Sequence, residues 1–356
     1  MHQFAIRAGI TAGVTVIGTG LVAAAPVTVP PPTARLLGIQ LTAGAEDITL
    51  DFVRHGQSTD DLNGILGTLP PGAHLTPLGV QQSDEVAQDI QQEYPAGLSG
   101  VYASQLIRTQ ETAAAVAHDF GTNVQVLPDL NEIPAGVLEE QPRNLFVEAG
   151  YFFPMAAWIL GNLSVTEPGT TYNGAQFDEQ VTNAVDTIYN NTVAGNGPPT
   201  DVAVSSGGVI AIWTLLNVKN PDFLAIIDSV LKNGGPPPNA GQDIIEGNPT
   251  DGWTLVSWDG TPVPQTPNLI DALYVDYRDL FMAEQLAIYN IGQAIQGGDQ
   301  ADITAALQTG YSQIVAAMEE FPKAVAETFA QASSDGASTA GAAAGESVSD
   351  SLLGSL

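Results

Sequence analysis

The sequence predicts an α/β fold of three layers, in which helices flank a mostly parallel sheet and further helices extend the C-terminus. Three observations support this fold class. Short apolar runs typical of buried strands alternate with longer segments of helical periodicity. Glycine and proline are frequent, at 37 and 24 of the 356 residues, which predicts many turns and loops. Hydrophobic residues make up 44% of the chain, enough for a core.

The predicted strands and helices alternate along the first two thirds of the chain. Thr76-Pro77 favours the start of a helix, because proline suits the first helical turn. The apolar segment 152–160 is interpreted as a cap or lid, and the Asp259-Gly260 turn after Trp253 to Ser257 predicts a hairpin. Strands are expected at 48–53, 101–103, 124–127 and 202–205, and helices at 79–94, 106–119, 176–192 and 209–217.

Beyond residue 268 the pattern becomes helical. A stripe of apolar residues recurs at steps of three and four and is expected to form a packing face: Ile303, Leu307, Tyr311, Ile314 and Met318. Residues 332–356 are rich in alanine, serine and glycine and have no bases, so we expect a disordered tail. A short helix at 346–355 is the alternative.

The N-terminal residues have the composition of an export segment. Residues 8–25 are uncharged and mostly small or apolar, follow Arg7 and precede a proline-rich stretch. This pattern is typical of a signal peptide or an uncleaved signal anchor. We therefore expect an exported protein, secreted or associated with the cell envelope, which contacts a membrane only through this segment. A buried core helix is the alternative.

These features divide the chain into five expected parts. They are a signal peptide or anchor (1–25), a linker (26–45), an α/β domain (46–265), a helical extension (266–331) and a low-complexity tail (332–356). The sequence leaves the oligomeric state open.

The charge balance excludes several classes of partner and chemistry. The formal net charge is −30, and all 39 acidic residues lie from Glu46 onward. Such a surface repels phosphate backbones, and no basic patch interrupts it, so nucleic acid is not expected as a partner. The absence of cysteine excludes disulfides, thiolate nucleophiles and cysteine-ligated metals. Histidine chemistry is restricted to His2, His55, His74 and His118.

Polar side chains follow several of the predicted strands. Arg54 and His55 end the first strand, Ser104 and Arg108 follow the second, and Ser205 to Gly208 follow the fourth. Since the carboxyl ends of parallel strands meet at one edge of a sheet, these groups should converge there. Arginine suits phosphate oxygens, and a neutral histidine can attack phosphorus. A carboxylic acid is also needed to protonate the leaving oxygen.

The segment Ile48–Gly56, followed by Gln57-Ser58, resembles the opening motif of the histidine phosphatase superfamily, the phosphoglycerate-mutase-like proteins. Further segments resemble this family in the same order: 75–82, 101–109, 130–136 and 204–210. The resemblance covers about residues 48–217, and the hairpin near Trp253 extends it to about residue 265.

This resemblance implies a role for individual residues. His55 would be the nucleophile that becomes a phosphohistidine, and Arg54 and Arg108 would hold the phosphoryl oxygens. Glu132 would protonate the leaving alcohol and then activate water. No metal or other cofactor is implied, because side chains carry the chemistry.

The sequence also leaves alternatives within the site. Glu139 and Glu140 are rivals of Glu132 for the acid role. The family has a histidine where this chain has Ser206, which with Gly207 is expected to bind phosphate. His74 is an alternative source of the missing imidazole. Asp61 stands where the family often has asparagine.

The predicted function is that of an exported phosphatase that hydrolyses a small phosphate monoester through His55, with an activity that Ser206 would lower. A mutase is disfavoured, because an exported enzyme would lack a bisphosphate to rephosphorylate the histidine. The alternative is a non-catalytic member that binds a phosphorylated ligand or a protein partner. A surface interaction protein is a third reading, based on the C-terminal helices and the acidic tail.

Overall fold

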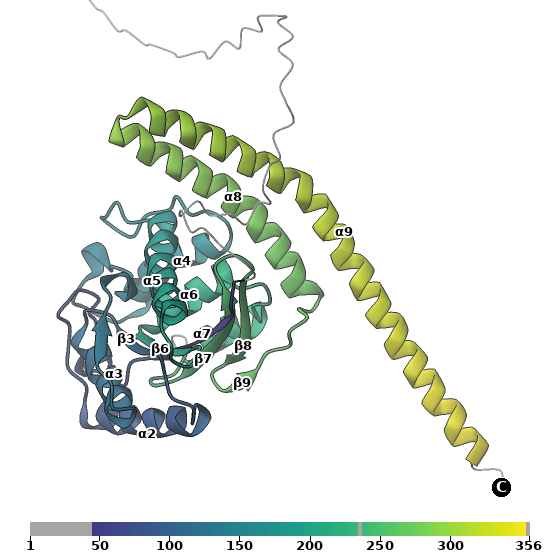
Figure 1. The fold of residues 1–356 in the computed structure, drawn as a ribbon, viewed down its shortest axis with the longest axis horizontal. Helices are drawn as coiled ribbons and strands as arrows, with labels where there is room; N and C mark the ends of the chain where they lie inside the picture. Colours follow the sequence, from purple (N-terminus) through teal and green to yellow (C-terminus); the bar gives the residue numbers. More distant parts are fainter. Residues whose placement is uncertain (1–44, 234–236, 354–356) are drawn as a thin grey trace, which may run out of the picture.

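A seven-stranded mixed sheet forms the centre of the molecule (Figure 1). The computed structural model describes residues 45–233 and 237–353. The strand order is β4-β3-β6-β1-β7-β8-β9; the first four run parallel and the last three are added antiparallel. The strands are β1 (Ile48–Arg54), β3 (Gly100–Ala103), β4 (Val124–Val126), β6 (Thr200–Ser205), β7 (Gln242–Asn248), β8 (Gly252–Trp258) and β9 (Thr261–Pro262).

Helices cover both faces of this sheet and complete the predicted three layers. Helices α2 (Pro77–Glu93) and α3 (Ile107–Asp119) share one core with the sheet, whereas α4 (Leu145–Ile159), α5 (Gly174–Ala194) and α6 (Gly207–Asn217) share the other. Shorter elements are α1 (Thr59–Asn63), α7 (Phe223–Asn233), the 3-10 turns η1 (Pro128–Leu130) and η2 (Gly136–Leu138), and a separate two-stranded ladder of β2 (Ile65–Leu66) and β5 (Gln141–Pro142).

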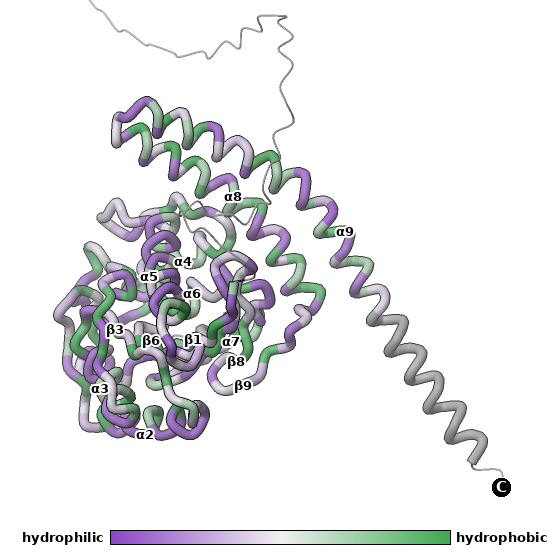
Figure 2. Tube along the Cα trace, in the orientation of Figure 1, coloured by the Kyte–Doolittle hydropathy of each residue, from purple (hydrophilic) through white to green (hydrophobic). Residues whose placement is uncertain are grey.

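Strand β1 shows how the two cores are separated. Because successive side chains of a strand point to opposite faces, Leu50 and Phe52 enter the core of α4, α5 and α6, whereas Val53 enters that of α2 and α3. All three are fully buried. The apolar residues that enter these cores appear in green along the tube of Figure 2. This two-sided burial explains why β1 is recognisable as a continuous apolar run.

The structure confirms the predicted strands and helices of the α/β domain and the hairpin at Asp259-Gly260, which joins β8 to β9. Strand β7 was not predicted, because Gln242, Asp243 and Glu246 interrupt its apolar pattern. It nonetheless pairs with β1 and is mostly buried. The expected lid segment is part of helix α4.

The C-terminal extension is a pair of antiparallel helices, α8 (Leu269–Gly297) and α9 (Gln300–Leu353). Helix α8 ends at Gly298, whose φ of 78° reverses the chain. The prediction of a disordered tail was wrong, because α9 continues through that segment to Leu353. Alanine is the strongest helix former, and the alanine-rich composition that suggested disorder is also compatible with a helix.

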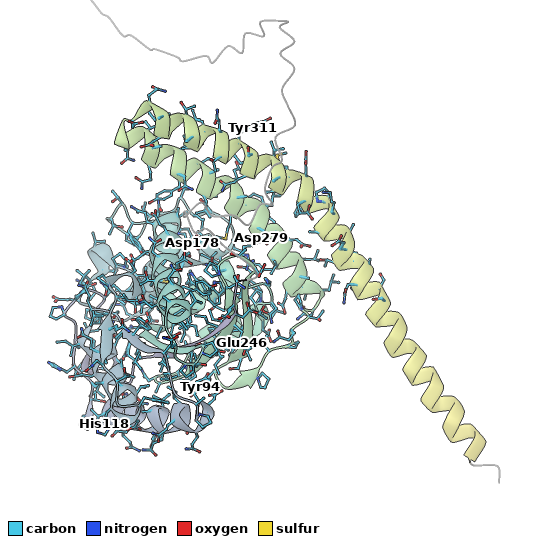
Figure 3. All side chains as sticks on the ribbon, viewed as in Figure 1. Tyr94, His118, Asp178, Glu246, Asp279 and Tyr311 are labelled. Carbon is cyan, nitrogen blue, oxygen red and sulfur yellow. The ribbon has the colours of Figure 1, made fainter. Side chains whose placement is uncertain are left out.

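The apolar stripe of α9 forms the predicted packing face only in part. Ile303 and Ile314 are half-buried. Leu307, Tyr311 and Met318 are 50%, 71% and 64% exposed, and Tyr311 is labelled on α9 in Figure 3. The close contact with α8 is at the buried Gly310, where an added Cβ would lie 3.2 Å from that of Ala287.

The predicted export segment and linker lie outside the described residues, except for the end of the linker. Within residues 45–233 and 237–353, no helix is both long enough and apolar enough to cross a membrane.

Candidate active site

His55 lies at the carboxyl end of β1, and its side chain is buried. Its Nδ1 donates to the carbonyl oxygen of Gly56 at 2.8 Å, which leaves Nε2 with a free electron pair. Burial, reinforced by the charge of Arg108, lowers the pKa of His55 to about 3. The imidazole is therefore neutral near pH 7, with Nε2 as its nucleophilic atom.

Two arginines approach this histidine from different elements. Arg108, in the first turn of α3, is buried and donates from Nε to His55 Nε2 at 3.0 Å. Arg54, the last residue of β1, donates from Nη1 to the carbonyl oxygen of Pro237 at 2.7 Å. Within the described part of the chain, Arg54 Nε and Arg108 Nη1 are buried without a hydrogen-bond partner. The site therefore has donors available for an anion.

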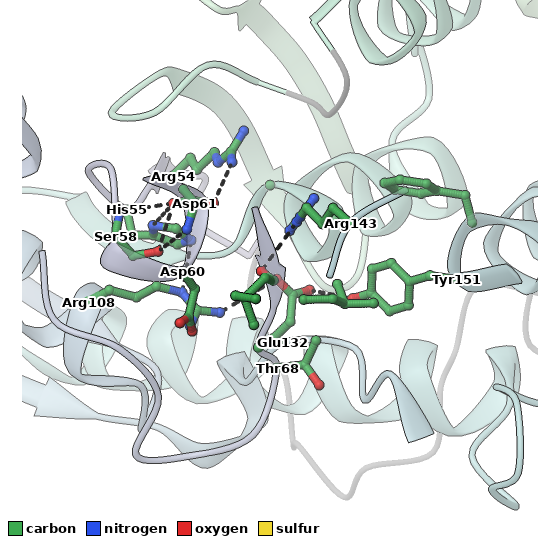
Figure 4. A pocket seen from close by; sticks show the side chains of 16 residues that line it. Arg54, His55, Ser58, Asp60, Asp61, Thr68, Arg108, Glu132, Arg143 and Tyr151 are labelled. Atoms are coloured by element: carbon green, nitrogen blue, oxygen red, sulfur yellow. Dashed lines mark hydrogen bonds and ion pairs between the residues drawn. The ribbon is translucent and has the colours of Figure 1, made fainter. Parts of the chain in front are cut away.

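Asp61 is the nearest carboxylate to this group (Figure 4). Its Oδ1 lies 3.8 Å from Arg54 Nη2 and its Oδ2 lies 3.9 Å from His55 Nδ1. The Ser58 amide and hydroxyl both donate to Oδ2 at 2.9 Å, as part of the capping box of α1. Burial alone would raise the pKa of Asp61, but His55, Arg54 and Ser58 outweigh it and lower the pKa to about 2.

Glu132 lies on the other side of Arg108 and lines the same pocket. Its Oε2 is 3.9 Å from Arg108 Nη2, and its Oε1 accepts from the hydroxyl of Tyr151 at 3.2 Å. Its rivals are placed elsewhere. Glu139 accepts hydrogen bonds from Thr68 and from the amide of Leu69, and Glu140 is exposed; neither lines the pocket.

Ser206 and Gly207 stand at the start of α6, after β6. Gly207 lines the pocket together with Gly208, whereas Ser206 is buried directly before them. Within the described residues, the Ser206 hydroxyl has no hydrogen-bond partner and does not cap the helix.

The pocket also contains two residues that the sequence did not single out. Arg143 follows β5 and Tyr151 belongs to α4, and both line the pocket wall (Figure 4). Phe152, from the segment predicted as a cap or lid, lines it as well. Three of the seven basic residues after Glu46 therefore meet in one pocket of a chain with a net charge of −30. The rarity of arginine in this sequence was the available signal for Arg143.

The remaining described histidines lie away from the pocket. His74 has a side chain that is 68% exposed, and its Nδ1 is 2.6 Å from Glu111 Oε1. His74 therefore does not supply a second imidazole to the site. His118 lies on the surface of α3, as predicted (Figure 3).

Comparison with known protein families agrees with the resemblance seen in the sequence. Residues 50–226 match the model of the histidine phosphatase superfamily, branch 1. The α/β domain belongs to the histidine phosphatase superfamily. The match includes β1, the segment of Arg108 and Glu132, and the start of α6.

Two kinds of curated relative are similar to this histidine phosphatase domain and its surroundings. PE-PGRS family protein PE_PGRS11 of Mycobacterium tuberculosis is 41% identical over 290 residues, which cover 79% of this chain and 48% of that protein. The probable phosphoglycerate mutase GpmB of Yersinia pestis is 37% identical over 92 residues, covering 26% of this chain and 40% of that protein. The chain thus spans less than half the length of these relatives.

Solved structures of a phosphatase and of a mutase are also similar to part of this chain. Mycobacterial glucosyl-3-phosphoglycerate phosphatase matches with 20% identity and a TM-score of 0.47, covering 60% of this chain and 99% of that one. Phosphoglycerate mutase from Bacillus anthracis matches with 15% identity and a TM-score of 0.44, covering 60% and 94%.

Proposed function

We propose that this protein is a phosphatase that hydrolyses a small phosphate monoester through a phosphohistidine on His55. The observation that carries the proposal is the buried, neutral His55 with Arg54, Arg108 and Glu132 around it. In phosphoryl transfer, positioning and charge stabilisation supply most of the catalysis, and this set provides both.

In the first step, His55 Nε2 attacks phosphorus and the ester P–O bond breaks. Arg108 now donates to Nε2, so the phosphoryl oxygens must take over its guanidinium when the substrate binds. Arg54 and Arg108 stabilise the charge on those oxygens. Protonated Glu132 gives its proton to the leaving alcohol oxygen, and the Gly56 carbonyl continues to hold Nδ1–H.

In the second step, a water molecule replaces the alcohol. Glu132, now ionised, takes a proton from this water as its oxygen attacks phosphorus. The Nε2–P bond breaks, inorganic phosphate leaves, and neutral His55 and protonated Glu132 are restored. The Tyr151 hydroxyl lies 3.2 Å from Glu132 Oε1 and 2.9 Å from the carbonyl oxygen of Ile133, and it helps to fix the carboxyl group in the pocket wall.

Ser206 supports a second candidate, a non-catalytic member that binds a phosphorylated ligand or a protein partner. A serine hydroxyl is neutral and shorter than the imidazole that the family has at this position. Loss of one charge-stabilising donor typically lowers the rate by about 10²–10³-fold. We place reduced turnover ahead of no turnover, because the nucleophile, both arginines and the acid are all in the pocket.

The test is phosphate release from a broad panel of phosphate esters by the full-length protein, beside His55→Ala and His118→Ala. We expect turnover that His55→Ala abolishes and that His118→Ala, on the exposed face of α3, leaves unchanged. Quenching with alkaline detergent during turnover of radiolabelled ester should trap a phosphoprotein that is stable in alkali and loses its label in acid. Equal background release from all three proteins would contradict catalysis on those esters, and retained binding of inorganic phosphate would then favour the second candidate.

We also propose that the protein is exported, on the basis of the uncharged apolar residues 8–25 after Arg7. Fractionation of cells that express the full-length chain tests this. Recovery in the culture medium or cell envelope is expected, and recovery only in the cytosol would contradict export.

A further inference from the structure

Carboxylates offset most of the positive charge in the pocket. Arg54, Arg108 and Arg143 supply three positive charges, Asp60 and Asp61 supply two negative charges, and Glu132 is the proton donor of the proposed mechanism. His55 is neutral. A pocket that takes a phosphoryl group is thus not strongly positive, which restricts the charge of the group that it can favour.

Asp61 is the carboxylate closest to Arg54 and His55 in this pocket. Its Oδ1 lies 3.8 Å from Arg54 Nη2 and its Oδ2 lies 3.9 Å from His55 Nδ1 (Figure 4). Glu132 instead lies beside Tyr151. Asp61 therefore competes with a phosphoryl oxygen for Arg54 and repels the negative charge that His55 must attack.

Asp61 is also fixed in this position. Two hydrogen bonds from Ser58 hold Oδ2, and the Asp61 amide donates back to the Ser58 hydroxyl at 3.1 Å. Its side chain is only 19% exposed, so water screens its charge weakly. An anion in the pocket therefore meets a fixed negative charge that cannot swing away without breaking the cap of α1.

We propose that Asp61 makes this site select phosphoryl groups with a single negative charge over those with two. The proposal rests on the proposed function only in that the pocket takes a phosphoryl group. Because Asp61 cancels one of the arginine charges, a second negative charge on the ligand gains little further attraction, whereas the cost of removing that charge from water rises. The preferred substrates are a singly protonated phosphate monoester or a phosphodiester.

The direct test is the binding of inorganic phosphate and of sulfate to the full-length protein by calorimetry at about pH 5.5 and about pH 8.5. Inorganic phosphate changes from mainly singly to mainly doubly charged across this range, whereas sulfate is doubly charged throughout. Wild type should bind phosphate about ten-fold more tightly at the lower pH and bind sulfate weakly at both.

Asp61→Asn is the informative variant, because asparagine has the same shape and its side-chain oxygen can still accept from Ser58. We expect it to bind sulfate about ten-fold more tightly than wild type at both pH values and to lose the preference for phosphate at the lower pH. Asp84→Asn, which removes an exposed charge on α2, is the matched control and should change neither constant.

Sulfate is the control for titration of the protein, because its own charge does not change between the two pH values. The charged and titratable groups that line the pocket with Asp61 are Arg54, His55, Arg108, Asp60, Glu132 and Arg143. A change in their protonation would alter sulfate binding as well. Equal sulfate binding by wild type and Asp61→Asn, or tighter phosphate binding by wild type at about pH 8.5, would overturn the proposal.

A diester arm distinguishes the two preferred substrates. Bis(p-nitrophenyl) phosphate stays singly charged, whereas an alkyl monoester such as glycerol 2-phosphate loses its second proton at about pH 6. If only the monoester is hydrolysed and its kcat/KM falls with rising pH, the preferred substrate is the monoanionic monoester. If the diester is hydrolysed at both pH values, the preferred substrate is a diester. Because the binding measurements need no turnover, failure of this inference is distinguishable from failure of the proposed hydrolysis.

Discussion

At the scale of single residues, unpartnered donors mark the site. Ser206 is 1% exposed, and its hydroxyl has no partner among the described residues. A buried hydroxyl without a hydrogen bond costs about 1–3 kcal/mol, which a bound phosphoryl oxygen would recover. This hydroxyl stands next to Gly207, which lines the pocket. Because the unpaired hydroxyl destabilises the free protein, we expect it to donate a hydrogen bond to the bound ligand.

Substitution of Ser206 tests this role. We expect Ser206→Ala to lower kcat about ten-fold without lowering the melting temperature, because the variant loses a donor to the ligand but buries no unpaired hydroxyl. Steady-state kinetics on the best ester, together with thermal unfolding, measure both effects. An unchanged kcat would assign Ser206 the alternative role of a small residue that fills a tight turn.

At the scale of elements, helix α8 joins the C-terminal extension to the α/β domain. Arg278 is 4% exposed and donates from Nη1 to the carbonyl oxygens of Leu215 and Val218, at 2.9 and 2.7 Å. These carbonyls lie at the C-terminal end of α6, where helical carbonyls lack partners and the helix dipole favours a cation. Since α6 begins at the active site, α8 stabilises the helix that carries Gly207.

Arg278→Ala should therefore destabilise the domain. Removing the guanidinium leaves the buried carbonyl of Val218 without this donor, and we expect a loss of about 2 kcal/mol in the free energy of unfolding. Urea denaturation measures the loss. Lys323→Ala, at a side chain that is 62% exposed on α9, is the control and should change stability little. Equal stability of the two variants would show that α8 does not support α6.

At the scale of the whole molecule, buried acids give stability an unusual dependence on pH. Burial raises the pKa of Asp51 to about 8, of Asp201 to about 7 and of Glu167 to about 8. The folded state therefore binds more protons than the unfolded state, and stability falls as pH rises towards these values. His55 acts in the opposite direction, but only below its ordinary pKa of 6.5.

We therefore expect the melting temperature to fall by several degrees between about pH 6.5 and about pH 8.5, where the buried acids lose their protons. Asp51→Asn should reduce this fall, because it removes one of the groups that must ionise inside the core. Exposed Asp84→Asn should not. Thermal unfolding across the pH range provides the measurement, and a melting temperature that rises with pH in this window would refute the assignment.

Local patterns in the sequence were sufficient for much of this molecule. Apolar runs and helical periodicity predicted β1, β3, β6 and the helices between them, because burial on both faces leaves a continuous signal. Position at strand ends brought Arg54, His55 and Arg108 into one group, since parallel strands end at one edge.

Only the tertiary structure decided features that depend on distant partners. The structure assigns the acid role to Glu132, which lines the pocket. Its rival Glu139 lies outside the pocket and is hydrogen-bonded by Thr68, about seventy residues earlier in the chain. Arg143 entered the pocket because β5 pairs with β2. Strand β7 forms despite its polar residues because it pairs with β1 in the sheet. Only part of the predicted stripe of α9 is covered, and the close contact with α8 lies at Gly310, outside that stripe. Periodicity reports that a face is apolar, whereas packing decides which face is covered, because coverage depends on elements far along the chain.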